Sequence, residues 1–186
     1  MRKIIGAALL ALLLVAASDV SATPLEKVDC KRLSITVSTA SDADWTECYR
    51  AKQREPGERA DEVQADYQIM MADLRTHVLL IQTGKAGRNS YFFKDSIEAR
   101  MKEYDELENR SDFTDESEFE DYELVRFQAD LWKKPADCIG FLKYTHATYT
   151  QGGGGGAGSY TLGYDCWRNG APDRATIEAL LKSIKW

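Results

Sequence analysis

The chain has 186 residues, with 24 basic and 30 acidic side chains and a formal net charge of −6 at pH 7. This acidic balance argues against nucleic acid as a partner, because phosphate backbones are bound mainly by clustered lysine and arginine. A chain of this length suits one domain around one buried core.

The amino-terminal segment has the pattern of a secretory signal peptide. A short cationic start (residues 1–3) precedes an unbroken apolar run (residues 4–17), and Val-Ser-Ala at 20–22 is a small-residue cleavage pattern. The run is too short for a transmembrane helix, and no later segment approaches the ~18 apolar residues that such a helix needs. We therefore expect residues 1–22 to be removed and residues 23–186 to form a single exported domain without a membrane span. A retained signal anchor is the alternative.

Four cysteines remain in the mature chain, and an even number in an exported protein predicts two disulfides. Local pairing gives Cys30–Cys48 and Cys138–Cys166. A redox-active site is unsupported because the sequence has no C-x-x-C motif, and the spacing is not that of a zinc knuckle. We expect no metal site and no cofactor.

The first part of the mature chain mixes strand patterns with loops. Residues 45–51 fit either a helical turn or a returning strand, and the charged segment 53–61 predicts an exposed loop. Residues 63–71 alternate as a strand does, although they also fit a helical stripe. Before them, residues 31–37 predict a half-buried strand whose inward face holds Leu33, Ile35 and Val37.

The middle of the chain predicts a hairpin followed by a helix. Residues 77–82 are a short apolar run typical of a buried strand, and a glycine-containing turn at 84–87 leads to a second strand at 90–93. Asp95 and Glu98 then resemble a capping box, so we expect a helix over residues 95–108. Its apolar face carries Ile97, Met101, Tyr104 and Leu107.

Residues 103–123 hold eleven acidic side chains and a single basic one, Arg110, which gives a local charge of −10 (1 − 11). An EF-hand calcium loop starting at Asp112 needs glycine at its sixth position, where Ser117 stands. We therefore interpret the run as a solvated helix end followed by an acidic loop. Loose cation binding and docking onto a basic partner are the alternatives.

Two strands on either side of a glycine run form the hairpin around which the sequence is organised. When antiparallel pairing sets Cys138 opposite Cys166, the turn falls within residues 151–157. A cross-strand Cα separation of about 4.5–5.5 Å lies inside the range that disulfides adopt. The same register places three further pairs on the same face: Gly140–Tyr164, Leu142–Leu162 and Tyr144–Tyr160.

The remaining elements complete the expected fold. Residues 173–185 predict a closing helix capped by Asp173. Antiparallel strands with helices packed on one face define an α+β fold, with helices near 95–108 and 173–185 and no second domain. Before the hairpin, residues 123–131 predict a strand whose inward residues are Val125, Phe127, Ala129 and Leu131.

The sequence shows no catalytic constellation, and we assign no catalytic residue. His77 begins an apolar strand and is interpreted as a residue at the edge of the core, whereas His146 is interpreted as a surface residue. Neither Ser90 nor Ser159 lies in a G-x-S-x-G motif. The glycine run at 152–156 lacks the Lys and Ser/Thr of a phosphate-binding loop.

Two groups of residues are candidates for binding. Tyr144, His146 and Tyr160 share one predicted face near the mouth of the glycine loop. Lys85 and Arg88 belong to a glycine-containing turn that offers backbone amides and two cations to an anion. A basic turn without a ligand is the alternative for the second group.

These observations favour a non-enzymatic exported protein of the cell envelope, periplasmic or secreted, that binds an envelope protein or a small ligand. One alternative is an exported hydrolase that uses His146 as its base. Another is a secreted interaction module that acts through the acidic segment 103–123, with a salt-dependent complex. The sequence leaves the ligand and the oligomeric state open.

Overall fold

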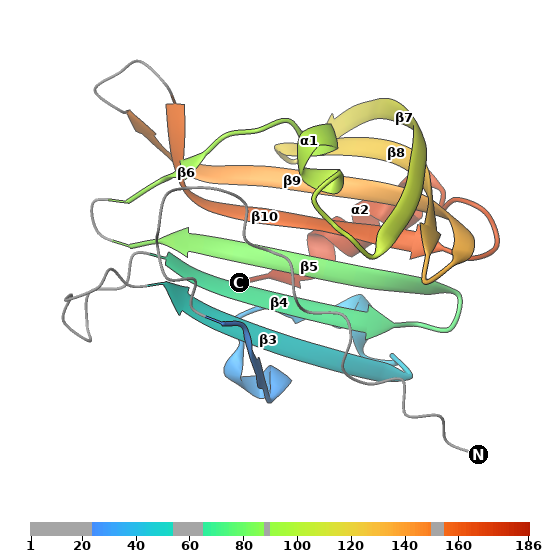
Figure 1. Cartoon of the computed structure of the whole chain (residues 1–186), viewed down its shortest axis with the longest axis horizontal. Coiled ribbons are helices and arrows are strands. Elements are labelled where there is room, and N and C mark those ends of the chain that lie inside the picture. Colours follow the sequence, from blue (N-terminus) through green and yellow to red (C-terminus); the bar gives the residue numbers. More distant parts are fainter. Residues whose placement is uncertain (1–23, 54–64, 88–89, 150–154) are drawn as a thin grey trace.

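The computed structural model describes residues 24–53, 65–87, 90–149 and 155–186, and most of them belong to one antiparallel sheet (Figure 1). Across this sheet the strands follow one another in the order β1 (Glu26–Val28), β3 (Trp45–Gln53), β4 (Ala65–Asp73), β5 (His77–Ala86), β10 (Gly155–Trp167), β9 (Lys134–Tyr149), β8 (Tyr122–Leu131) and β7 (Leu107–Phe119).

The other elements are short. β6 (Phe92–Phe93) pairs with β10, and β2 (Thr36–Val37) forms a separate two-stranded sheet with β11 (Ile184–Lys185). The two α-helices are α1 (Ile97–Met101) and α2 (Arg174–Ser183), and single 3₁₀ turns occur at Cys30–Arg32 and Ser38–Ala40. The fold therefore has the expected mixture of helix and antiparallel strand, but the sheet dominates it.

The predicted register of the central hairpin is confirmed. β9 and β10 pair so that Cys138 faces Cys166 and Tyr144 faces Tyr160. Both predicted disulfides are present, with Cα separations of 5.1 Å for Cys30–Cys48 and 4.1 Å for Cys138–Cys166. Because β10 also pairs with β5 on its other side, this hairpin lies in the middle of the sheet.

Apolar side chains lie on both faces of the sheet, because a helix covers each face. α1 contributes Met101 to a core that includes Leu80, and we refer to this side as the α1 face. α2 contributes Ile177 to a second core that includes Leu79, the α2 face. Figure 1 shows α1 in front of the strands and α2 behind them. The expectation that the helices pack on one face is therefore wrong.

The sheet curves strongly towards the α1 face. Trp45 at the start of β3 contacts Trp132 in the turn between β8 and β9, with 6.1 Å between ring centroids. The strands β4, β5 and β10 separate these two segments along the sheet. Since neighbouring strands are roughly 4.8 Å apart, a flat sheet would hold the two rings much further from each other.

The amino-terminal predictions hold in part. Leu33, Ile35 and Val37 are all buried as expected, but only Thr36–Val37 forms a strand. A 3₁₀ turn replaces the start of the predicted strand, because the Asp29 side chain accepts a hydrogen bond from the Lys31 amide. The strand alternative is correct both for β3 and for β4. Most of the predicted loop 53–61 lies outside the described residues.

The hairpin predicted for residues 77–93 is wrong. β5 pairs with β10 so that Lys85 faces Ser159, and β6 then pairs further along the same strand, where Phe92 faces Ala157. β6 thus continues β5 beside β10 and does not fold back on it. Gly84 lies inside β5 and not in a turn. Glycine is needed there because a Cβ would be 2.3 Å from Cε1 of Tyr160.

The helix predicted for 95–108 is much shorter than expected. Ser96, and not Asp95, caps α1 by accepting a hydrogen bond from the Ala99 amide. The chain then enters β7 at Leu107. All four residues predicted for the apolar face, Ile97, Met101, Tyr104 and Leu107, are nevertheless buried.

The acidic segment forms an edge strand, so the predicted acidic loop is also wrong. β7 pairs with β8, but the register shifts along the way. From Glu108 to Ser111, and again from Ser111 to Thr114, β7 advances three residues while β8 advances two. Asn109 and Asp112 adopt φ angles of 50° and 56°, a region that asparagine and aspartate tolerate better than most residues. These bulges let an acidic sequence remain in a strand while most of its side chains face solvent.

The last strands and the closing helix agree with the sequence, except that α2 ends at Ser183 and Ile184–Lys185 form β11 instead of the predicted helix end. Val125, Phe127, Ala129 and Leu131 of β8 are buried. Asp173 caps α2, where its carboxylate accepts a hydrogen bond of 2.8 Å from the Thr176 amide. Hydrogen bonding with Thr176 lowers the pKa of Asp173.

The close contact at Gly84 gives a stability test. We expect Gly84→Ala to destabilise the protein by about 1–3 kcal/mol, because overpacking forces the Tyr160 ring or the backbone to move. Tyr160→Ala removes the ring that Gly84→Ala would overpack. The double variant should therefore lose less unfolding free energy than the two single variants lose in total. Urea unfolding of the four proteins measures this coupling, and strictly additive losses would contradict the contact.

Candidate functional site

The structure brings two of the predicted binding residues together. The rings of Tyr144 and Tyr160 lie 6.5 Å apart on the α1 face, near the turn of the central hairpin. Tyr160 is only 8% exposed, and its hydroxyl accepts a hydrogen bond of 2.6 Å from Gln82 Nε2. Tyr144 is half-buried, and its hydroxyl accepts a hydrogen bond of 3.0 Å from the Asp95 amide. Tyr160 therefore belongs to the core, and Tyr144 packs beside it nearer the surface.

The other predicted binding residues are not part of this pair. His146 is exposed with a φ of 56°, and its side chain has no hydrogen bond to another of the described residues. Because Tyr160 covers Gly84 on the α1 face, the next residue, Lys85, points to the α2 face, where it is exposed. Arg88 lies outside the described residues.

An exposed aromatic pair lies beside Tyr144 and was not identified from the sequence. Phe93 is 71% exposed and Tyr91 is 40% exposed, and their rings meet edge to face at 5.2 Å. Between them Phe92 points inward and packs on Tyr160, with 4.9 Å between the two ring centroids. Alternation along a strand explains this arrangement, and it could have been anticipated from three consecutive aromatic residues in a strand pattern.

Lys94 and Asp95 connect the aromatic pair to Tyr144. Lys94 follows Phe93 directly and places its ammonium group 5.8 Å from the centre of the Tyr144 ring. The next residue, Asp95, is hydrogen bonded to the Tyr144 hydroxyl. We refer to Tyr91 and Phe93 as the aromatic surface.

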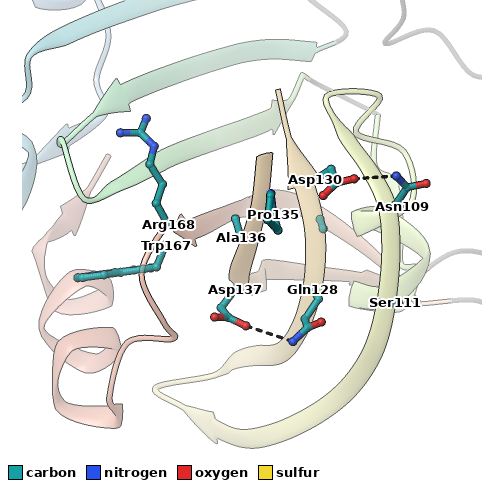
Figure 2. A pocket seen from close by; sticks show the side chains of 10 residues that line it. Asn109, Ser111, Gln128, Asp130, Pro135, Ala136, Asp137, Trp167 and Arg168 are labelled. Carbon is teal, nitrogen blue, oxygen red and sulfur yellow. Dashed lines mark hydrogen bonds between the residues drawn. The ribbon is translucent and has the colours of Figure 1, made fainter. Parts of the chain in front are cut away.

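A polar pocket of about 310 Å³ lies near the opposite end of β9 (Figure 2). Two pairs of side chains organise it. Asn109 Nδ2 donates to Asp130 Oδ2 at 2.7 Å, and Gln128 Nε2 donates to Asp137 Oδ1 at 3.4 Å. The backbone of β10 at Trp167 closes another side. Sequence reasoning missed these residues, because single polar positions on strands resemble ordinary solvent-facing ones.

A buried carboxyl group lies next to this pocket. Asp165 is 2% exposed, and one of its oxygens accepts a hydrogen bond of 2.7 Å from Trp167 Nε1. Its other oxygen has no hydrogen-bond partner among the described residues and lies 3.8 Å from Nε2 of His77. Burial raises the pKa of Asp165 to about 7, only partly offset by the bond from Trp167.

His77 completes this group and is half-buried at the edge of the core, as the sequence predicted. Its ring stacks on that of Trp167, with centroids 4.1 Å apart and an interplanar angle of 2°. Burial lowers the pKa of His77, and the nearby charge of Arg168 acts in the same direction, whereas Asp73 opposes both. The stack and the bond to Asp165 together fix the indole of Trp167.

Two other features of the described residues bear on function. Within those ranges, no three side chains of the kinds that bind metal ions are grouped closely enough to form a site. Neither described helix has the length and hydrophobicity needed to cross a membrane.

Comparison of the chain with known protein families, with curated proteins and with solved structures finds no match in any of the three.

The buried carboxyl group predicts a pH-dependent stability. Because the folded state raises the pKa of Asp165 from about 4 to about 7, it favours the protonated form. Protonation of Asp165 contributes to the free energy of unfolding. This contribution is fully present below about pH 4 and is lost as the pH rises through about 7. A difference of about three pH units corresponds to about 4 kcal/mol.

Asp165→Asn tests this expectation, because the amide oxygen can still accept from Trp167 without carrying a charge. The variant should unfold at a higher temperature than the wild type at pH 8, with the gain shrinking towards pH 4. Asp42→Asn, at an exposed carboxylate, serves as the control. An equal melting temperature of wild type and Asp165→Asn at pH 8 would show that the carboxyl group carries no such strain.

Proposed function

We propose that the protein is an exported, non-enzymatic binding protein of the cell envelope, periplasmic or secreted, that captures another protein through its aromatic surface. The secretory pattern of residues 1–22 and the two disulfides support export, because disulfides persist in oxidising compartments. The hydrolase alternative lacks comparable support. No hydrogen bond with the described residues orients His146 as a base.

The exposure of Phe93 is the observation that carries this proposal. Single exposed apolar residues are common on soluble proteins, but here a phenylalanine that is 71% exposed contacts a second exposed aromatic ring. Pairing of β6 with β10 holds the ring in a regular strand, so it is presented to solvent in a fixed position. Large aromatic anchors of this kind dominate the energy of many protein interfaces.

The composition of the surface favours a protein over a small ligand. Tyr91 and Phe93 are exposed and do not line the polar pocket, so they can insert into a partner's pocket. Lys94 and Asp95 follow Phe93 directly, so charged residues border the aromatic pair along the chain. An apolar centre with a polar rim is the usual arrangement of a protein interface.

Partner capture by surface variants tests the proposal. Tagged mature protein is used to purify partners from a native envelope extract, with Phe93→Ser and Tyr91→Ser as the test variants. Trp45→Ser is the matched control, because Trp45 is 37% exposed at the far end of the sheet. We expect a stoichiometric partner that wild type and Trp45→Ser retain and that Phe93→Ser weakens at least about tenfold, equal to about 1.4 kcal/mol.

Melting temperatures of all variants verify that the fold is intact. A partner that Phe93→Ser binds as tightly as the wild type would overturn the assignment of the aromatic surface. If that same partner dissociated with rising salt, the acidic strand β7 would become the better candidate for the interface.

A further inference from the structure

We propose that the polar pocket is a second binding site, and that it accepts a neutral polyhydroxylated ligand such as a saccharide. The pocket is separate from the aromatic surface, because it lies at the start of β9 and the end of β10, whereas β6 pairs with the start of β10. This inference does not depend on the proposed protein partner.

Hydrogen bonding between its side chains preorganises the pocket. Asn109 orients the carboxylate of Asp130, and Gln128 orients that of Asp137, as Figure 2 shows. Each carboxamide retains a carbonyl oxygen and a further N–H, and each carboxylate retains further acceptor positions. All four side chains project from strands, which hold such groups more firmly than loops do.

The charge of the pocket argues against an anionic ligand. Asp130 and Asp137 supply two carboxylates, and among the described residues Arg168 is the only arginine or lysine that lines the pocket. The Arg168 guanidinium is already engaged, because it donates to Asp73 Oδ2 at 2.9 Å and to the Arg75 carbonyl at 2.6 Å. Figure 2 shows this side chain pointing away from Asp137. The free charge facing a ligand is therefore negative.

The mixture of donors and acceptors argues against a simple cation. An ammonium group only donates hydrogen bonds, so it would leave the free N–H groups of Asn109 and Gln128 without acceptors. A hydroxyl both donates and accepts, and adjacent hydroxyls on a sugar ring match a row of carboxylate and carboxamide groups. A ligand with both functions therefore makes more hydrogen bonds with this mixture of groups than a cation does.

The size and the apolar part of the pocket suit such a ligand. A volume of about 310 Å³ is at the small end of the ~300–1,000 Å³ range of ligand sites. Pro135 and Ala136 add apolar surface for the C–H groups of a ring. The wall at Trp167 is rigid, because its indole is stacked on His77 and bonded to Asp165.

Nuclear magnetic resonance with defined saccharides tests this inference. ¹⁵N-labelled protein is titrated with two neutral probes, maltotriose and N,N′,N″-triacetylchitotriose. We expect saturable shifts of the backbone amides of Gln128, Asp137 and Trp167 with at least one probe. Asp137→Ala should weaken that binding about tenfold or more, equal to about 1.4 kcal/mol. Glu26→Ala, at an exposed carboxylate on the opposite edge of the sheet, should leave it unchanged.

A second variant keeps the test independent of any folding defect. Gln128→Ala removes a donor from the neighbouring strand and should weaken the same shifts while the melting temperature stays near that of the wild type. Absence of pocket shifts with both saccharides would overturn the proposal. Pocket shifts with ethanolamine alone, as a cationic probe, would overturn it in favour of a cation site.

Discussion

Cys138 and Cys166 face each other across β9 and β10, and this pair determines which residues point to each face of the sheet. Side chains alternate along a strand, so a slip of one residue would exchange the two faces. In the observed register Leu142 and Tyr164 join the core under α1, while Ile139 and Phe141 join the core under α2. A covalent bond in the middle of the sheet thus fixes two cores together.

Both candidate binding regions follow from that arrangement. The end of β9 carries Tyr144 to the α1 face, where its hydroxyl accepts a hydrogen bond from the Asp95 amide, and β6 beside β10 leaves Phe93 exposed. The start of β9 carries Asp137 to the pocket, beside the segment where β10 ends at Trp167. One hairpin therefore supports an apolar, projecting surface near one end and a polar, recessed site near the other.

The sequence predicts the elements whose pattern is dictated by local chemistry. The cross-strand cysteines determine a register, alternating apolar residues identify β8, and Asp173 with its apolar stripe identifies α2. For α1, the sequence predicts the buried residues correctly but not the length of the helix. The four apolar residues are buried even though the helix ends at Met101 and Leu107 begins a strand.

The remaining differences depend on contacts between distant segments. Gly84 resembles a turn residue in the sequence, yet it lies in a strand because Tyr160 packs over it. The acidic run resembles a loop, but bulges at Asn109 and Asp112 and packing of Phe113 on Phe127 keep it in the sheet. The pocket could not be predicted, because Gln128 and Asp137 become a pair only through the register of β8 with β9.

Disulfide mapping of the purified protein tests this account most directly. A non-reducing protease digest is analysed by mass spectrometry for cross-linked peptides. The register of β9 with β10 requires a peptide in which Cys138 is joined to Cys166, and the edge of the sheet requires a second in which Cys30 is joined to Cys48. A peptide joining Cys30 to Cys138 would contradict the register, and with it both cores and both candidate binding regions.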